Sequence, residues 1–216
     1  MSQLPVMIVA TIVWCYWLSV LVMIVRSRLK HHTAAGAVPQ TERERWMWLV
    51  WVPTVFAWLA FPVLGYRPTL PMVAALHWAP DHIVVFIQWL AVLAALLAYA
   101  LTVPCWLALG SNWSLAVVPN KKTNLVTDGW YSRIRHPIYA LGLLLMLATV
   151  AVVPSPAVVV LAAVHTTLVV LKVANEERYL TQRHGQAYVD YCGRTGRFLP
   201  RLAPEIPLGT GERNQT

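Results

Sequence analysis

Charged residues are scarce in this sequence. Only 12% of its 216 residues are Asp, Glu, Lys or Arg, whereas about a quarter are charged in an ordinary soluble domain. Apolar residues make up 58%, which is typical of an integral membrane protein. The charge is basic, with 17 Lys and Arg against 9 Asp and Glu. In a soluble protein this excess would favour nucleic-acid binding, but the apolar composition argues against a nucleic-acid partner here.

Several signatures of other protein classes are missing. The three cysteines, Cys15, Cys105 and Cys192, are an odd number, lie far apart and lack metal-ligand spacing, so we predict neither a disulfide framework nor a metal site. No G-x-G-x-x-G motif follows a strand, which argues against a Rossmann domain. The first apolar run has its basic residues after it and not before it, unlike a cleaved signal peptide, so we expect that run to be retained.

Long apolar runs predict an all-α, integral membrane helical bundle. An α-helix rises 1.5 Å per residue, so roughly 20 apolar residues cross the hydrocarbon core. About five transmembrane helices are expected, at residues 5–25, 46–64, 83–107, 137–153 and 157–173. Pro104 should mark a kink or an end, and the last two spans should form a tight helical hairpin. We expect one membrane domain (1–216), with the first three spans in 1–109, the functional motifs in 110–200 and a C-terminal tail in 201–216.

Positive charge predicts the orientation of these spans. Outside the spans, every Lys and Arg except Arg67 lies after the first, the third or the fifth apolar run. By the positive-inside rule these segments are cytoplasmic and the N-terminus is outside. We therefore expect a multi-pass protein whose active site faces the cytoplasm.

The first of two polar clusters lies between the third and fourth spans. It contains Arg133, Arg135 and His136, and Pro137 follows as the first residue of a helix whose N-terminal end attracts anions. His136 and Tyr139 should share one face of that helix. The arginines could instead serve only to bind anionic lipid headgroups.

The second cluster begins at the end of the fifth span. Lys172 and Glu176 are one helical turn apart, and the pair could be a snorkelling lysine beside an interfacial carboxylate. Ionisable residues inside a membrane are costly, however, and favour a functional site. The short hairpin between the last two spans should bring both clusters to one membrane face.

The motifs in these clusters read Gly-Ser-Asn-Trp at 110–113, Leu-Val-Thr-Asp-Gly-Trp-Tyr at 125–131, Arg-His-Pro-Ile-Tyr at 135–139, Glu-Glu at 176–177 and Phe-Leu-Pro at 198–200. Together they resemble the isoprenylcysteine carboxyl methyltransferase family and, more loosely, membrane phospholipid N-methyltransferases. The resemblance covers about residues 110–200, the methyltransferase motif region, and implies S-adenosylmethionine as the cofactor, bound by the cytoplasmic loop and the last helices. The cofactor contacts that it implies are Asn124, Leu125, Val126, Tyr131, His136, Pro137, Ile138, Tyr139 and Glu176.

Two positions depart from the family pattern. Lys172 falls where isoprenylcysteine enzymes have a substrate-contacting arginine, which gives up the bidentate fork suited to a carboxylate. The glycine usually found two residues after the motif tyrosine is Leu141 here, with Gly142 one place later. The first departure concerns the substrate and the second the packing of the cofactor.

The residue types themselves fit this cofactor. Its carboxylate can bind Arg135, His136 and the helix N-terminus, and Glu176 can accept hydrogen bonds from its ribose or ammonium group. Tyr131 and Tyr139 can pack against adenine or the sulfonium. We predict Lys172, Glu176 and Arg135 as the catalytic residues.

Four functions remain open from the sequence. The first is methylation of a lipid-like acceptor that enters from the bilayer, with the carboxylate of an isoprenylcysteine-type substrate as the expected group. The second is N-methylation of an ethanolamine headgroup, for which Glu177 or His136 would be a candidate base. The third is a nicotinamide-dependent membrane reductase. The fourth is a non-catalytic protein whose basic loops only bind membrane lipids.

Overall fold

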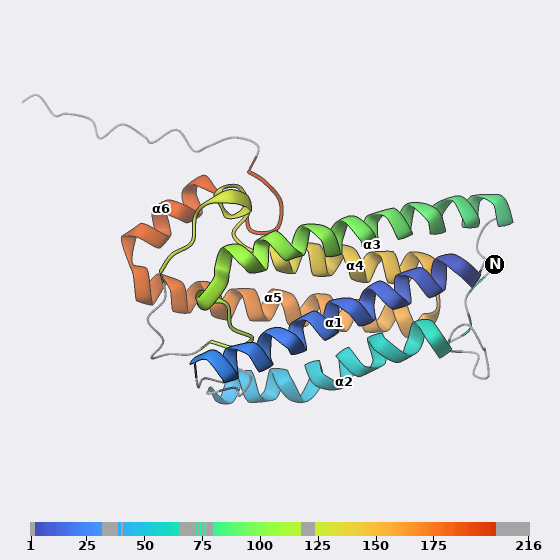
Figure 1. Cartoon of the computed structure of the whole chain (residues 1–216), viewed down its shortest axis with the longest axis horizontal. Helices are drawn as coiled ribbons and strands as arrows, with labels where there is room; N and C mark the ends of the chain where they lie inside the picture. The colour runs from blue at the N-terminus through green and yellow to red at the C-terminus, as the bar shows by residue number, and fades with distance from the viewer. Residues whose placement is uncertain are drawn as a thin grey trace, which may run out of the picture.

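The computed structural model is a bundle of helices (Figure 1). It describes residues 3–31, 39, 41–64, 72, 74, 76, 80–117 and 124–201. The α-helices are α1 (Gln3–His31), α2 (Glu42–Leu64), α3 (Asp81–Leu109), α4 (Pro137–Val152), α5 (Pro156–His184) and α6 (Gln186–Arg194). Two short 3-10 helices, η1 (Gly110–Asn112) and η2 (Gly129–Ser132), lie between α3 and α4. The described residues contain no strand, which confirms the predicted all-α class.

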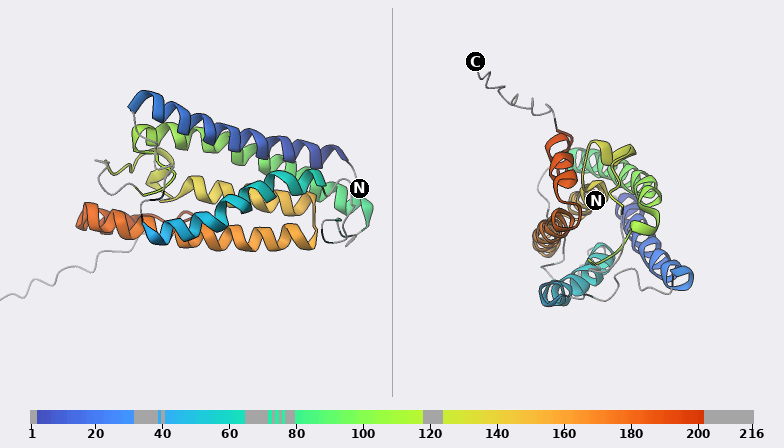
Figure 2. Two further views of the ribbon diagram at one scale, coloured as in Figure 1. Left: turned by 90° about the horizontal axis from the view of Figure 1, so that it is seen from below. Right: turned by 90° about the vertical axis from the view of Figure 1, so that its left-hand side faces the viewer.

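Four helices are long and apolar enough to cross a membrane, namely α1, α2, α3 and α5. The predicted fourth span forms α4, which has 16 residues and is therefore about 24 Å long at 1.5 Å per residue. That is shorter than the roughly 30 Å hydrocarbon core. In Figure 2 (left), α4 begins farther into the bundle than the neighbouring ends of α1 and α5. The first turn of α4 is therefore recessed between longer helices.

Two predicted helix ends differ from the structure. The fifth helix does not stop near Val173 but continues to His184, because the polar residues after the apolar run are also helical. Lys172 therefore lies well inside α5 and not in its last turn. Pro104 lies within α3, which continues past it to Leu109. The position of Lys172 shows that hydropathy marked the apolar part of α5 and not the whole helix.

The hydrophobic core lies where α1, α3 and α4 meet. Ala91, Ala95 and Ala98 of α3 are buried, and small side chains at this spacing let neighbouring helix backbones approach closely. Leu145 and Met146 of α4 are buried in the same core. The short helix α4 is thereby fixed against α3 along its length.

The predicted tight hairpin joins α4 to α5. Val153 ends α4, and the hydroxyl of Ser155 accepts a hydrogen bond from the backbone N–H of Val158 at 3.3 Å. A side-chain oxygen at this position satisfies one of the free N–H groups of a helix start. The connection expected at 66–81 and the tail from 202 onward lie largely or wholly outside the described residues.

The opposite end of the bundle holds α6, η1 and η2 (Figure 1). Gly185 joins α5 to α6 with a φ of 56°, a left-handed conformation that glycine adopts without strain. Tyr188 and Tyr191 of α6 are buried. Both predicted polar clusters lie at this end, as the hairpin between the last two helices requires.

Candidate active site

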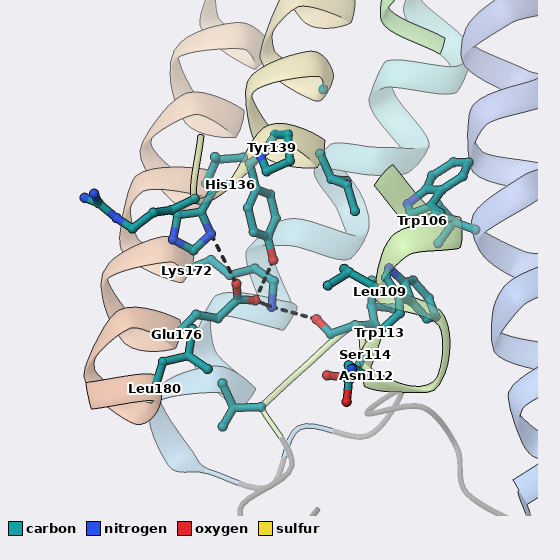
Figure 3. A pocket seen from close by; sticks show the side chains of 18 of the residues that line it. Trp106, Leu109, Asn112, Trp113, Ser114, His136, Tyr139, Lys172, Glu176 and Leu180 are labelled. Carbon is teal, nitrogen blue, oxygen red and sulfur yellow. Dashed lines mark hydrogen bonds and ion pairs between the residues drawn. The ribbon is translucent and has the colours of Figure 1, made fainter. Parts of the chain in front are cut away.

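Four polar side chains meet at the recessed start of α4 (Figure 3). The Tyr139 hydroxyl donates a hydrogen bond to Glu176 Oε1 at 2.5 Å, and Lys172 Nζ lies 3.2 Å from the same oxygen. His136 Nδ1 is 3.9 Å from Glu176 Oε2. We call Tyr139, Lys172, His136 and Glu176 the polar cluster. It consists of the two pairs that the sequence placed on shared helix faces.

Lys172 also fixes the segment that follows η1. Its side chain is 9% exposed, and Nζ donates a hydrogen bond to the backbone carbonyl of Leu115 at 2.6 Å. An ammonium group has three N–H donors, and these two contacts use two of them. Lys172 is therefore a tie between α5 and residues 113–117 as well as a candidate substrate contact.

The second carboxylate of the Glu-Glu pair points to a different set of partners. Glu177 Oε1 lies 3.1 Å from Arg135 Nε and 3.3 Å from His136 Nε2. Arg197 binds Glu177 through Nε, at 3.2 Å, and through Nη2. The hydrogen bonds between Arg197 and Glu177 raise the pKa of the guanidinium. His136 consequently lies between two carboxylates, one from each side of its ring.

Arg135 joins the C-terminal segment to the start of α4. Its guanidinium donates to the backbone carbonyls of Cys192, at 3.2 Å, and Thr195. Its backbone N–H donates to Gly196 at 2.8 Å, beside the isolated parallel bridge between Ile134 and Gly196. The sequence predicted Arg135 as a catalytic and carboxylate-binding residue; the contacts described here are with the protein itself.

Gly196 is required at this junction by close packing. A Cβ atom there would lie 1.8 Å from the backbone oxygen of Leu199, which is far inside van der Waals contact. Glycine at 196 therefore allows the C-terminal segment to turn back on itself at residues 196–199, directly after the residue that pairs with Ile134.

Tyr131 connects η2 to α3 and α6. Its hydroxyl donates to the carbonyl of Cys105 at 3.4 Å, and its own carbonyl accepts a hydrogen bond from the Tyr191 hydroxyl at 2.6 Å. Burial raises the pKa of Tyr131 and that of Tyr191 to about 12. Both phenols are therefore neutral near pH 7, and the ring of Tyr131 is held rigidly.

One cavity contacts all the residues that the sequence predicted. It is lined by the eleven predicted site residues: Asn124, Leu125, Val126, Tyr131, Arg135, His136, Pro137, Ile138, Tyr139, Lys172 and Glu176. Its other wall, which we call the aromatic wall, contains Tyr16, Trp17, Trp48, Trp51, Trp58, Trp106 and Trp113. The cavity thus joins a charged end beside residues 124–136, which we call the motif loop, to an aromatic interior.

Leu141 and Gly142, where the sequence departs from the family pattern, face different parts of the structure. Gly142 lines the cavity, and a Cβ there would lie 3.7 Å from the Tyr16 hydroxyl. Leu141 packs against the hydrophobic core. The glycine that is shifted by one place therefore faces the cavity.

The cavity also contacts polar side chains that sequence reasoning did not assign to the site, of which His165 and Glu44 are two. His165 of α5 was interpreted as a helix-packing residue; it packs against Trp58, with ring centroids 4.9 Å apart, and also lines the cavity. Glu44 of α2 lines the cavity and is 2% exposed. A Thr-x-x-Glu pattern at residues 41–44 suggests only a helix cap, so the sequence carried no signal for a buried role.

Comparison with known proteins identifies the part of the chain that carries these motifs. Residues 89–182 match the isoprenylcysteine carboxyl methyltransferase (ICMT) family. The match covers less than half of the chain, so it shows a similarity to this family over that segment. The matched ICMT segment contains α3 from residue 89 onward, the motif loop, α4 and nearly all of α5, so it includes the whole polar cluster. Glu44 and α6 lie outside it.

Two named relatives are similar to this chain over about half of their length. The chain is 32% identical to the nickel-cobalt-cadmium resistance protein NccN of Alcaligenes xylosoxydans xylosoxydans over 51% of this chain and 52% of the relative. It is 35% identical to the cobalt-zinc-cadmium resistance protein CzcN of Cupriavidus metallidurans over 44% of each. The matches thus span about half the length of these curated relatives.

Proposed function

We propose that this protein is a membrane methyltransferase that uses S-adenosylmethionine to methylate a lipid-like acceptor, with the carboxylate of an isoprenylcysteine-type substrate as the acceptor group. The observation that carries the proposal is the single cavity in which the polar cluster and the motif loop face an aromatic wall. The similarity of residues 89–182 to the ICMT family supports the methyltransferase class over a reductase or a lipid-binding protein without activity.

The residues present fit the cofactor that we propose. Ile138 and Tyr139 stand in the first turn of α4, where backbone N–H groups have no partner within the helix, and both line the cavity. Such a helix start can bind a carboxylate. Glu176 can accept from the ribose or the ammonium group, and the rings of Tyr131 and Tyr139 can pack on adenine or on the sulfonium.

When bound, S-adenosylmethionine supplies a methyl group on a positively charged sulfur. A carboxylate acceptor is already a nucleophile, so the protein needs to align the two reactants and exclude water, and needs no general base. We assign alignment to the polar cluster, whose carboxylate is held by Tyr139 and Lys172. The third N–H of Lys172 can bind one oxygen of the acceptor.

N-methylation of an ethanolamine headgroup is the second candidate, and a specific observation favours it. Lys172 is already bound to Leu115 and Glu176, which leaves it less able to hold a carboxylate than a free arginine fork would be. A neutral amine acceptor would need a base to take its proton. His136 is the candidate base, and the two carboxylates near its ring could orient the imidazole.

We also propose that the protein sits in the membrane with this site facing the cytoplasm and its N-terminus outside. Support comes from the charge distribution and from the gathering of the motif loop and α6 at the end of the bundle opposite the N-terminus (Figure 1). The metal resistance for which the two relatives are named is compatible with a methyltransferase. Among the described residues, no group of three or more His, Cys, Asp or Glu could hold a metal ion.

Two assays on the purified full chain in lipid nanodiscs test the proposal. Calorimetry should detect binding of S-adenosylhomocysteine and S-adenosylmethionine but not of NADPH; the reverse would overturn the methyltransferase assignment. Radiolabelled methyl transfer to a farnesyl-cysteine analogue, but not to an ethanolamine phospholipid, would support the carboxylate acceptor. Transfer to the phospholipid alone would replace it by the second candidate.

A further inference from the structure

Glu44 occupies an unusual place for a helix-capping residue. The Thr41 hydroxyl accepts a hydrogen bond from the backbone N–H of Glu44 at 3.3 Å, which is one half of a capping box. In a complete box the carboxylate would reach back to the backbone N–H of the threonine. Here Glu44 Oε1 instead accepts hydrogen bonds from the Val117 N–H at 3.0 Å and from Asn175 Nδ2 at 3.5 Å. The carboxylate is thereby turned from the start of α2 toward α5 and the cavity.

The second oxygen of this carboxylate has no donor. Glu44 Oε2 is buried without a hydrogen-bond partner among the described residues, and the residue as a whole is 2% exposed. Burying an acceptor without a donor is costly, and more so for an ionised group. Because Glu44 lines the cavity, a ligand in that cavity can supply the missing donor.

The charges around the cavity show what kind of donor fits. Lys172 is paired with Glu176, and Arg135 is paired with Glu177. Among the described charged residues that line the cavity, Glu44 is thus the one without an ion-pair partner. A ligand group that is both positively charged and an N–H donor would satisfy the free oxygen and the unbalanced charge together.

We propose that Glu44 binds a protonated amine of the bound ligand. This proposal rests on the proposed function, which offers two sources for such a group. One is the α-ammonium of the cofactor, and the other is the ammonium of an ethanolamine-type acceptor, which must give its proton to the candidate base His136 before it can accept the methyl group. Both sources carry the same chemistry, and the experiment below separates them.

The Glu44→Gln variant isolates the free oxygen. The amide oxygen of Gln can still accept from Val117 N–H, so the contact with residues 113–117 is kept, while the unpartnered acceptor becomes an NH₂ donor and the charge is lost. Glu42→Gln is the matched control, because Glu42 lies in the same turn of α2, carries the same charge and is exposed. Glu44→Asp, which keeps the charge but withdraws it by one methylene, serves as a second variant if the Gln variant does not fold.

The first measurement is calorimetric affinity in nanodiscs for S-adenosylhomocysteine and for its analogue in which hydrogen replaces the α-amino group. If Glu44 binds the cofactor, Glu44→Gln should weaken S-adenosylhomocysteine binding about 10-fold or more, as expected for a lost hydrogen bond to a charged group. The same variant should leave the affinity for the deaminated analogue unchanged. Glu42→Gln should change neither.

The second measurement is the KM for an ethanolamine phospholipid in the methyl-transfer assay. If Glu44 binds the acceptor, Glu44→Gln should leave S-adenosylhomocysteine affinity unchanged and raise this KM about 10-fold. Unchanged affinity together with an unchanged KM, or with no transfer to the ethanolamine phospholipid at all, would overturn the proposal and leave Glu44 as an anchor for Val117. Failure of the wild-type protein to bind S-adenosylhomocysteine would instead overturn the proposed function, and the Glu44 proposal with it.

Discussion

The Tyr139 hydroxyl donates a hydrogen bond to Glu176 at 2.5 Å and so joins the first turn of α4 to the C-terminal third of α5. Lys172 contacts the same carboxylate oxygen from one turn earlier in α5. These two donors fix the direction of the carboxylate before any ligand binds. A preorganised acceptor of this kind can recognise a ligand without the cost of ordering its own side chain.

Replacing Glu176 tests the polar cluster directly. Glu176→Ala should weaken S-adenosylhomocysteine binding by about 1–3 kcal/mol, the range for a lost hydrogen bond to a charged group. Tyr139→Phe removes one of the donors that orient the carboxylate but keeps the carboxylate itself, so its effect should be smaller. Calorimetry on folded variants measures both, and an unchanged affinity for Glu176→Ala would show that Glu176 does not contact the cofactor.

Replacing Lys172 tests the acceptor end of the site. Lys172→Met should raise the KM for the acceptor, or lower kcat, and weaken cofactor binding only about as little as Tyr139→Phe, because each removes one of the two donors to Glu176. Lys172→Arg should be tolerated, because it keeps both the charge and the donors for Leu115 and Glu176. Steady-state kinetics with both substrates varied separates these effects, and an equal loss with Arg and Met would contradict a role that depends on charge.

The length of the acceptor tail is a further test of the lipid-like substrate. Short, water-soluble carboxylate analogues should be poor substrates compared with a farnesyl-cysteine analogue, because each buried methylene contributes roughly 0.8 kcal/mol. A series of acceptors with increasing chain length should show kcat/KM rising with each added segment. A flat series would exclude binding of the tail in the aromatic interior of the cavity.

The packing at Gly196 predicts a local loss of stability. Gly196→Ala places a methyl group against the Leu199 backbone, and overpacking of this kind typically costs about 1–3 kcal/mol. Limited proteolysis should cleave the segment after α6 faster in this variant. Gly193→Ala is the control, since a Cβ there meets no atom within 4 Å; equal cleavage of the two variants would contradict the steric account.

Orientation in the membrane can be measured with topology reporters. A reporter fused at Thr216 should give a cytoplasmic signal, and one inserted in residues 66–81 should give an external signal. The reason is that the basic residues outside the spans cluster on the side that the positive-inside rule assigns to the cytoplasm. A cytoplasmic signal from residues 66–81 would contradict the proposed orientation.

The apolar runs were sufficient to predict the helices, but not where every helix ends. Five runs correspond to α1–α5 because a membrane-spanning helix needs a continuous apolar segment. The extension of α5 to His184 was not predicted, since polar residues beyond the membrane give no hydropathy signal. The start of α4 at Pro137 was predicted, because proline is favoured as the first residue of a helix.

In the candidate site, too, some contacts could be predicted from the sequence and others could not. Motif residues such as Tyr139 and Glu176 could be predicted to meet, because the hairpin between α4 and α5 brings them to one end. The Lys172 contact with Leu115 and the position of Glu44 could not, since both depend on how residues 113–117 fold back over the bundle. Resemblance to a family identified the residues that bear its motifs and gave no information on α2.

The pairing of Ile134 with Gly196 has a consequence for the order in which the protein matures during synthesis. Chains emerge from the ribosome N-terminal end first, so α1 to α5 are all made before residues 195–197 become available. Until then, the backbone N–H groups of Arg135 and His136 lack the carbonyl partners that they have in the finished structure. The site should therefore acquire its final geometry only after the bundle has entered the membrane, which would keep a partly inserted chain from engaging its ligands.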